Sequence, residues 1–335
     1  MLGSKDMELS YSKDESPDTV QMLRWYQHSD TEHLLAEAKW NGYVNVHVIK
    51  KGENKLVYSA SFEGPITAVE WTKQGYLFAA IGNGKIVAID LKQNQSKEAV
   101  HVQGIVLQMK MLELPNQEYM LFGMADNRIQ IVSLKDDKKE FRELKASISA
   151  VDYLDGILAV GCSDESFLVC TLEELFHPNK PPPSTKPAGF QNGERICQIS
   201  ISPTKDAVTV CSTGGIMKEF KLGQNSYNSE TLIKDSNCLQ LITAFEYCPK
   251  SQTKLKLSAS LDGIIRIWSS NSTTVPRNTV KAESSVQSVT PEISAASWSK
   301  DGSFIAYSIG LSWNQGIYSL KQTPYRPRTY IHYFQ

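Results

Sequence analysis

A short phrase recurs along this chain with its order of small, apolar, polar and aromatic residues preserved. It occurs as Thr67-Ala-Val-Glu-Trp71, Ser149-Ala-Val-Asp-Tyr153, Thr243-Ala-Phe-Glu-Tyr247 and Ser294-Ala-Ala-Ser-Trp298. Weaker copies fill the gaps as Met22-Leu-Arg-Trp25, Gln108-Met-Lys-Met111 and Gln198-Ile-Ser-Ile201. The seven phrases end at 25, 71, 111, 153, 201, 247 and 298, in steps of 46, 40, 42, 48, 46 and 51 residues. The chain is therefore built from repeats.

A second set of segments can be counted independently of these phrases. Each begins with Gly, Asn or Asp, which supply the positive φ angles of tight hairpins, and continues as a β-branched or aromatic strand. The segments are 42–46, 84–89, 126–131, 164–169, 214–220, 262–268 and 314–319. Both counts give seven, and repeats of about 40–45 residues are typical of four-stranded propeller blades. We therefore predict an all-β fold, a seven-bladed β-propeller.

The start of the chain is predicted to close this ring. Residues 1–18 are polar, but Met7 to Tyr11 have the alternation of a strand. An open ring would leave two exposed sheet edges, which propellers avoid by pairing a terminal strand with the last blade. We predict an N-terminal extension over 1–18 and one propeller domain over 19–335, with blade openings near 25, 71, 111, 153, 201, 247 and 298.

Composition argues against a strong global attraction to nucleic acid or membranes. The 335 residues include 35 basic and 36 acidic side chains, a formal net charge of −1. The six cysteines form no Cys-x-x-Cys pair, and several lie in apolar strands such as Val160-Gly-Cys162, so we expect buried reduced thiols in an intracellular protein. No apolar run reaches the roughly 18 residues of a membrane span, so we expect no membrane-spanning segment.

Two inserts interrupt the rhythm of the repeats. Residues 177–193 contain Lys180-Pro-Pro-Pro-Ser-Thr-Lys-Pro187, whose prolines favour extended polyproline backbone and are expected to prevent strand pairing. We interpret this insert as a surface loop, with a ligand for a proline-recognising domain as the alternative. Residues 269–291 are rich in Ser, Thr and Asn and are interpreted as a solvated loop, with a phosphorylation segment as the alternative.

No pattern typical of catalysis or of a cofactor site is present. The histidines are scattered, and none is paired with cysteine at metal-ligand spacing. Acidic pairs such as Asp152 and Asp155 are predicted to cap turns between strands, and no phosphate loop or nucleophile elbow occurs. We expect a protein that is not an enzyme, with no cofactor, no metal and no cluster of polar residues in the central channel.

The C-terminal stretch interleaves basic and aromatic residues. Lys321, Arg326 and Arg328 alternate with tyrosines, a pattern that can neutralise and stack on single-stranded RNA. The alternative is that Thr329 to Phe334 form the last blade's strand, with the tyrosines packed and the arginines in a loop.

The seven units resemble degenerate WD repeats, since only Ile267-Trp268 retains the terminal tryptophan. Within that superfamily the chain is similar to the Rae/Gle-type mRNA export factor of the nuclear pore and to its sister, the Bub-type spindle-checkpoint propeller. Three segments carry the resemblance: 5–18, 293–307 and Ser308-Ile-Gly-Leu-Ser-Trp-Asn-Gln-Gly316. The tryptophan of the last phrase, Trp313, is typical of the export factor.

The resemblance implies a non-enzymatic scaffold that binds a GLEBS segment, from a nucleoporin for the export factor or from checkpoint kinases for the sister. Trp268 and Trp313 are then expected to contact the partner. The family's peptide-binding arginine aligns with Ile216, so Lys218 or Lys221 is the candidate replacement. The implied location is the nucleus and nuclear pore with a cytoplasmic pool, as a monomeric propeller within a hetero-complex. The alternatives are a checkpoint propeller and a generic WD-repeat scaffold subunit.

Overall fold

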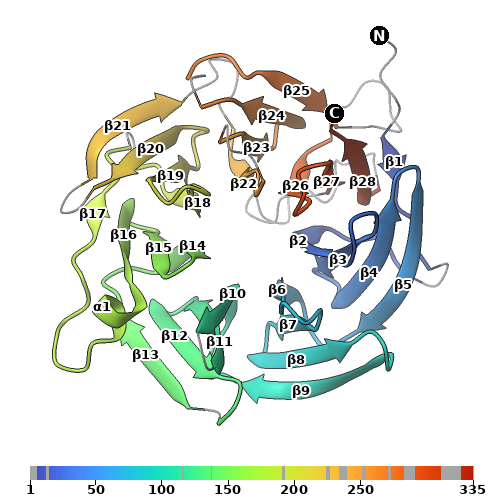
Figure 1. Cartoon of the computed structure of the whole chain (residues 1–335), viewed down its shortest axis with the longest axis horizontal. Coiled ribbons are helices and arrows are strands. Elements are labelled where there is room, and N and C mark those ends of the chain that lie inside the picture. The colour runs from blue at the N-terminus through green and yellow to red at the C-terminus, as the bar shows by residue number, and fades with distance from the viewer. Residues whose placement is uncertain are drawn as a thin grey trace.

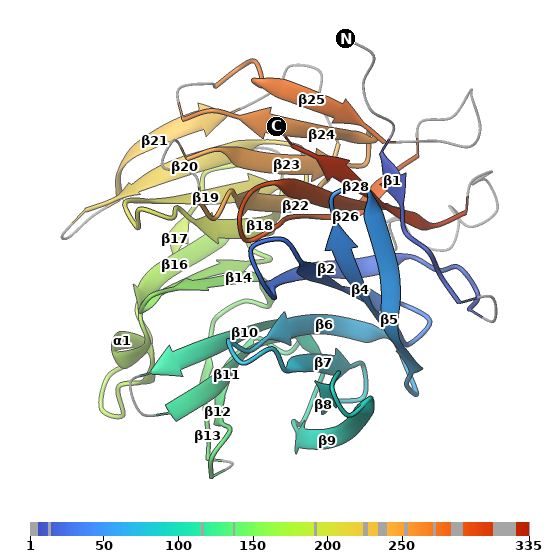
Figure 2. The ribbon, with the colours of Figure 1, turned by 45° about the vertical axis from the view of Figure 1, so that its right-hand side comes forward.

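Seven four-stranded antiparallel sheets are arranged in a ring around a central channel (Figure 1), which confirms the predicted seven-bladed β-propeller. The computed structural model describes residues 6–12, 15–114, 117–136, 138–190, 193–223, 227–233, 240–250, 254–270, 273–282, 291–310 and 326–334. Strands are strongly twisted from the channel outward (Figure 2). We number the sheets as blades 1–7 in the order in which their innermost strands follow along the chain.

Blades 1–4 each run from the innermost to the outermost strand in chain order. Blade 1 contains β2 (Val20–Gln27), β3 (His33–Lys39), β4 (Tyr43–Lys50) and β5 (Glu53–Ser61), and blade 2 contains β6 (Ile66–Trp71), β7 (Leu77–Ile81), β8 (Lys85–Asp90) and β9 (Gln95–His101). Blade 3 contains β10 (Val106–Leu114), β11 (Gln117–Met124), β12 (Arg128–Ser133) and β13 (Lys139–Glu143), and blade 4 contains β14 (Ile148–Leu154), β15 (Ile157–Cys162), β16 (Ser166–Thr171) and β17 (Lys186–Pro187).

Blades 5 and 6 follow the same order, and blade 7 combines both ends of the chain. Blade 5 contains β18 (Ile196–Ile201), β19 (Ala207–Ser212), β20 (Met217–Leu222) and β21 (Tyr227–Ile233). Blade 6 contains β22 (Ile242–Tyr247), β23 (Lys256–Ser260), β24 (Ile264–Trp268) and β25 (Asn278–Lys281). Blade 7 contains β26 (Ile293–Trp298), β27 (Phe304–Ile309), β28 (Arg328–Tyr333) and, from the start of the chain, β1 (Met7–Glu8). The predicted segment 314–319 lies outside the described residues, and the alternative C-terminal strand is confirmed as β28.

The ring is closed by the N-terminal strand, as predicted, but over a shorter length. Met7 pairs with Ile331 and Glu8 with Tyr330, and the Leu9 amide donates to the Thr329 carbonyl at 2.9 Å. The ladder ends before Tyr11 because the Ser10 amide donates to Asn54 Oδ1 in blade 1 at 2.9 Å instead. Closure therefore consists of a short ladder followed by contacts to blade 1.

Those contacts form a buried polar cluster that we call the N-terminal clasp, made by Tyr11 and Glu15 of the N-terminal segment with Glu37, Lys39 and Asn45 of blade 1. Lys39 Nζ lies 2.5 Å from Glu15 Oε1 and 3.6 Å from Glu37 Oε2. Asn45 Nδ2 donates to Glu15 Oε2 at 2.9 Å, and the Tyr11 hydroxyl donates to Glu37 Oε1 at 3.0 Å. The segment between blades 7 and 1 is thus held by charge-assisted bonds rather than by strand pairing.

The hydrophobic core lies between neighbouring blades, because each sheet buries both faces against the next. Trp25 packs against Phe304 between blades 1 and 7 with ring centroids 6.1 Å apart. Two of the tryptophans that end the phrases also tie blades together by hydrogen bonds. Trp71 Nε1 donates to the Arg24 carbonyl at 3.0 Å and Trp25 Nε1 to the Ser297 carbonyl at 3.1 Å. The aromatic residue of each of these phrases is therefore an anchor onto the preceding blade.

The turns between the second and third strands follow the predicted chemistry. Gly42 and Gly84 have φ of 86° and 88°, and a Cβ on either would meet a backbone oxygen at 2.4 or 2.3 Å. In blades 3 and 4 the left-handed residue is Asn127 (φ 64°) or Glu165 (φ 62°). Asp164 accepts from the Ser166 amide at 3.2 Å, which stabilises that turn from the preceding position.

Both inserts contribute outer strands, which corrects the predictions of an unpaired loop. Lys186 and Pro187 form β17 and pair with β16, and β25 lies inside the second insert. Pro187 is tolerated because β17 is an edge strand. A short helix, α1 (Leu172–Phe176), also precedes the first insert; Thr171 and Glu174 form its capping box.

Candidate functional site

The innermost strands of all seven blades carry the same irregularity at the same place. In each, the pairing with the second strand shifts by one residue, so that one residue bulges out of the ladder. The bulged residues are Gln21, Thr67, Leu107, Ser149, Cys197, Thr243 and Ser294. The first residue of the strong phrases is therefore a bulge residue.

Serine or threonine occupies the bulge for a local reason. The hydroxyl of Thr243 donates to the Ala259 carbonyl of the second strand at 3.2 Å, and that of Ser149 to the Gly161 carbonyl at 3.1 Å. A bulge disrupts the local ladder, and the side chain supplies a donor to the partner strand. Thr67 and Ser294 make the equivalent bond in blades 2 and 7.

Three residues after each bulge, one polar side chain per blade lies among apolar neighbours and is directed into the channel. We call this set the channel ring. Its members, from blade 1 to blade 7, are Arg24, Glu70, Lys110, Asp152, Ser200, Glu246 and Ser297. The ring corrects two sequence predictions: the channel does contain convergent polar residues, and Asp152 lies within β14 rather than in a turn.

Members of the channel ring bind one another across blade boundaries. Arg24 lies 3.4 Å from Glu70 on one side and 3.5 Å from Glu246, two blades away, on the other. Lys110 Nζ donates to Asp152 Oδ1 at 2.8 Å. The Ser200 hydroxyl donates to Asp152 Oδ2 at 3.2 Å. With the bond from the Ser297 hydroxyl to Glu246, all seven innermost strands take part, in one group from blades 6, 7, 1 and 2 and a second from blades 3, 4 and 5.

Its two most connected carboxylates also accept backbone donors from the next blade. Asp152 Oδ2 accepts the Ile201 amide at 2.8 Å, and Glu246 Oε2 accepts the Trp298 amide at 3.0 Å. Glu246 further accepts the Ser297 hydroxyl at 2.9 Å. Carboxylates that are saturated with donors in this way stabilise the ring and are poorly placed to act as a base.

A cavity of about 570 Å³ lies on the side of the channel ring where the innermost strands begin. Residues at strand starts and at the turns between second and third strands form its mouth, among them Thr19, Trp40, Ser163, Arg195 and Thr213. Arg24, Lys110, Asp152 and Glu246 form its floor. The size falls within the range of ligand pockets.

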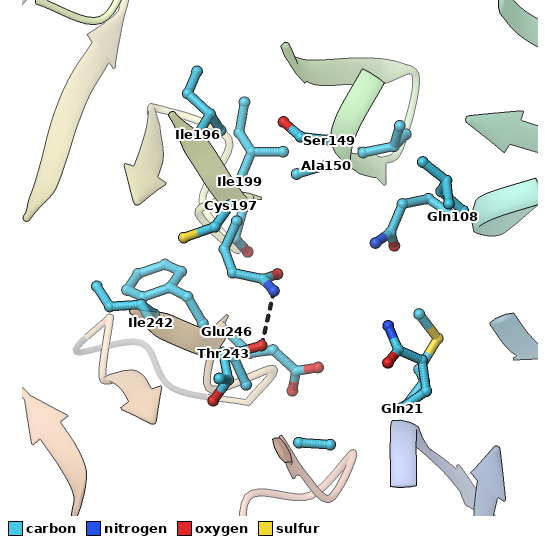
Figure 3. Close-up of a pocket in the computed structure, with 18 of the residues that line it drawn as sticks. Gln21, Gln108, Ser149, Ala150, Ile196, Cys197, Ile199, Ile242, Thr243 and Glu246 are labelled. Atoms are coloured by element: carbon cyan, nitrogen blue, oxygen red, sulfur yellow. Dashed lines mark hydrogen bonds between the residues drawn. The ribbon is translucent and has the colours of Figure 1, made fainter. Parts of the chain in front are cut away.

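Between mouth and floor, the walls carry carboxamides and small side chains. Figure 3 shows Gln21 and Gln108 pointing into the open centre, opposite Cys197 and Thr243. Gln198 Nε2 donates to the Thr243 carbonyl at 2.8 Å and so bridges blades 5 and 6. The side chain of Gln108 makes no hydrogen bond to any residue that the structure describes.

The predicted partner contacts are placed as follows. Trp268 is completely buried between blades 5 and 6, where its Nε1 donates to Ser258 Oγ at 2.9 Å. Its side chain therefore belongs to the hydrophobic core and not to a partner-binding surface. A partner cannot touch it while the two blades are packed together. Trp313 lies outside the described residues.

The two candidate lysines of blade 5 differ in environment. Lys218 is 9% exposed, and its Nζ donates to the Gly189 carbonyl at 2.8 Å, over the ring of Phe190. It therefore serves the packing between blades 4 and 5. Lys221 is exposed, and its side chain makes no hydrogen bond or ion pair with a described residue, so it is the one of the pair that a partner can reach.

Of the candidate RNA contacts, Arg328 is committed to ring closure. Its Nε lies 2.8 Å from Glu8 Oε1, and its guanidinium covers the ring of Tyr11 at 5.7 Å. Arg326 is exposed, and Lys321 lies outside the described residues. Of the two described arginines, one is therefore used in ring closure and the other is exposed.

The described residues contain no group of three or more His, Cys, Asp and Glu side chains that could hold a metal ion. Burial raises the pKa of the Cys197 thiol to about 12 and that of Cys162 to about 11, so both stay protonated at neutral pH. No helix in the described part of the chain is long and apolar enough to cross a membrane.

Sequence reasoning missed the channel ring although a signal for it was present. In every phrase the residue before the last is polar, from Arg24 to Ser297, and both of its neighbours are apolar. A single polar position in an otherwise apolar strand, repeated in every unit, indicates a side chain that faces a shared polar lumen.

A comparison with models of known protein families finds no match to this chain. A search of curated proteins likewise finds no significant match. The structure itself is that of a seven-bladed β-propeller and is consistent with WD repeats.

Proposed function

We propose that the protein is a non-enzymatic scaffold that binds segments of other proteins, and specifically a nuclear-pore-associated mRNA export factor that binds a GLEBS-type nucleoporin segment. The observation that carries the scaffold role is the closed ring, which presents loops from rigid strands on two faces. The saturation of Asp152 and Glu246 by hydrogen bonds supports a structural rather than catalytic use of the channel acids.

The more specific role is supported by the terminal segments that resemble the export factor. In the folded protein two of them meet, since the Tyr307 hydroxyl donates to Asp6 Oδ2 at 2.6 Å. His332 Nδ1 lies 2.8 Å from the other Asp6 oxygen. The resemblance therefore concerns one contiguous part of the molecule, the ring closure. The proposed location is the nucleus and nuclear envelope with a cytoplasmic pool, as a single propeller within a larger complex.

The test is calorimetric titration of the protein with the GLEBS segment of a nucleoporin from the same organism, and with a checkpoint-kinase segment for comparison. We expect submicromolar binding of the nucleoporin segment, weakened by Lys221→Glu. Lys92→Glu, an exposed lysine of blade 2, is the matched control. Trp268→Ala is unsuitable, because removing a fully buried tryptophan destabilises the fold by about 3–5 kcal/mol.

The outcome separates the levels of the proposal. Tighter binding of the kinase segment would replace the export role by the checkpoint role. Failure of both segments to bind would remove both specific roles and leave a scaffold for another partner. Partners would then be sought by crosslinking to Lys221 and its neighbours.

A further inference from the structure

We propose that the channel cavity is a binding site for an acidic segment of a partner protein, which enters from the mouth that carries Arg195 and reaches toward Lys110 on the floor. The inference rests on the proposed scaffold role, since the ligand is part of another protein. It adds a site inside the ring that is distinct from the lysines of blade 5.

The cavity has more unused hydrogen-bond donors than unused acceptors. The guanidinium of Arg195 is exposed at the mouth and pairs with no described residue; its backbone amide donates to Thr213 Oγ1 at 3.1 Å, and its carbonyl accepts from the Thr213 amide at 2.9 Å. Lys110 gives one of its three N–H donors to Asp152. The amide of Gln108 is unbonded to described residues, between these two levels.

The anionic groups of the cavity, by contrast, are occupied. Asp152 accepts four hydrogen bonds, from Lys110, Tyr153, Ser200 and Ile201. Glu246 accepts from the Ser297 hydroxyl and the Trp298 amide and lies beside Arg24. A cationic ligand would have to displace these bonds, whereas a carboxylate would satisfy donors that are free.

The lining charges point the same way. Arg24, Lys110 and Arg195 against Asp152 and Glu246 give three positive and two negative groups, a net of +1. Glu194, the neighbour of Arg195 in the chain, does not line the cavity; its carboxylate lies against Gly214, where an added Cβ would be 2.3 Å from Oε1.

The depth of the cavity favours a chain segment over a single ion. Arg195 precedes the ring residue of its own strand, Ser200, by five residues, which corresponds to roughly 16 Å along an extended strand. That length suits an extended peptide with carboxylates two or more residues apart, one toward Arg195 and one toward Lys110, better than it suits one small anion.

The probe is the capped heptapeptide acetyl-(Asp-Glu)₃-Asp-amide, titrated calorimetrically into the full protein. Its neutral counterpart acetyl-(Asn-Gln)₃-Asn-amide, a lysine heptapeptide and inorganic phosphate are titrated in parallel. Arg195→Gln and Gln108→Leu change groups without side-chain partners among the described residues, so the fold is expected to survive both. Lys110→Met is a third variant, and Lys92→Gln, an exposed lysine of blade 2 outside the cavity, is the control.

We expect the acidic peptide alone to bind, with its dissociation constant raised about fivefold or more by Arg195→Gln or Gln108→Leu, about tenfold by Lys110→Met, and unchanged by Lys92→Gln. The inference would be overturned if the neutral or the lysine peptide bound as tightly as the acidic peptide, or if the acidic peptide did not bind. It would also be overturned if phosphate bound and the acidic peptide did not, or if the control variant weakened binding as much as the cavity variants. A nucleoporin segment that binds with unchanged affinity to Arg195→Gln would leave the scaffold role standing and remove only the channel site.

Discussion

Lys39→Met is expected to open the N-terminal clasp and to cost about 3–5 kcal/mol of unfolding free energy at pH 7, the range for removing one partner of a buried ion pair. Lys39 faces two carboxylates, and the side chains of Lys39, Glu15 and Glu37 are only 3%, 1% and 0% exposed. Methionine fills a similar volume but leaves both acids buried without a cation. The double variant Lys39→Met/Glu15→Gln should recover part of the loss.

Two measurements test this prediction. Urea unfolding followed by tryptophan fluorescence gives the free energy, and hydrogen exchange of the Leu9 amide, which donates to Thr329, reports local opening of the closure. Lys55→Met is the matched control, because Lys55 is exposed on β5 and has no side-chain partner among described residues. A cost below about 1 kcal/mol, or Leu9 exchange equal to that of the control, would refute the clasp as the element that holds the ring closed.

The clasp also has a pH signature of defined sign. Burial by itself would raise the pKa of Glu37, but Lys39, His47 and the Thr329 hydroxyl outweigh it and hold the pKa below its ordinary value. The wild-type protein therefore loses stability as pH falls below about 4.3, where the unfolded carboxyl binds its proton first. In Lys39→Met the cation that opposes the effect of burial is gone, so the pKa of Glu37 rises. The difference in unfolding free energy between the wild type and the variant should therefore shrink between pH 7 and about 4.3.

Three further predictions concern the repeated backbone and the thiols. Gly42→Ala should lower the free energy of unfolding in urea by roughly 3 kcal/mol, and Gly52→Ala by about 1 kcal/mol. Both glycines have positive φ, 86° and 80°, but only at Gly42 would the added Cβ meet backbone atoms. Thr243→Val should cost about 1–2 kcal/mol by removing the hydroxyl that donates to the Ala259 carbonyl, whereas Thr243→Ser, which keeps the hydroxyl, should cost less. Cys162, which is fully buried and whose pKa burial raises to about 11, should react with a thiol reagent at pH 8 only after unfolding, which the difference in absorbance between the wild type and Cys162→Ser, with and without urea, measures.

The number of blades and the hairpin chemistry could be predicted because both depend on local rules that recur. Each phrase specifies an innermost strand, and each Gly or Asn turn supplies a left-handed residue such as Gly84 or Asn127. Glu165 shows the limit of that rule. It adopts φ 62° without being Gly, Asn or Asp, because Asp164 stabilises the turn from the preceding position.

The outer strands could not be predicted because they have little pattern of their own. β17 and β25 contain two and four residues in Pro-rich and Ser-rich inserts, and they pair because the third strand of the blade presents an open edge. Contacts between side chains of different blades could not be predicted from the sequence either. Whether Trp268 points into the core or outward depends on blades 5 and 6 together, not on its own strand.

The pattern of the channel ring follows from the number of blades. Acids occupy blades 2, 4 and 6, and donors occupy blades 1, 3, 5 and 7, so acceptors and donors alternate from Arg24 to Ser297. Strict alternation is impossible around an odd ring, and two donors, Ser297 and Arg24, must meet where blade 7 joins blade 1. Arg24 resolves the conflict by reaching past Ser297 to Glu246.

That same junction lies beside blade 7, in which β1 and β28 bring the two chain ends together. The bond from Trp25 to the Ser297 carbonyl acts across the junction, and the N-terminal clasp ties the segment that follows β1 to blade 1. The chain itself also crosses this junction, since residues 9–19 lead from β1 of blade 7 to β2 of blade 1, whereas the chain ends meet inside blade 7. The buried charge of the N-terminal clasp therefore lies beside the boundary at which two donors of the channel ring, Ser297 and Arg24, are neighbours.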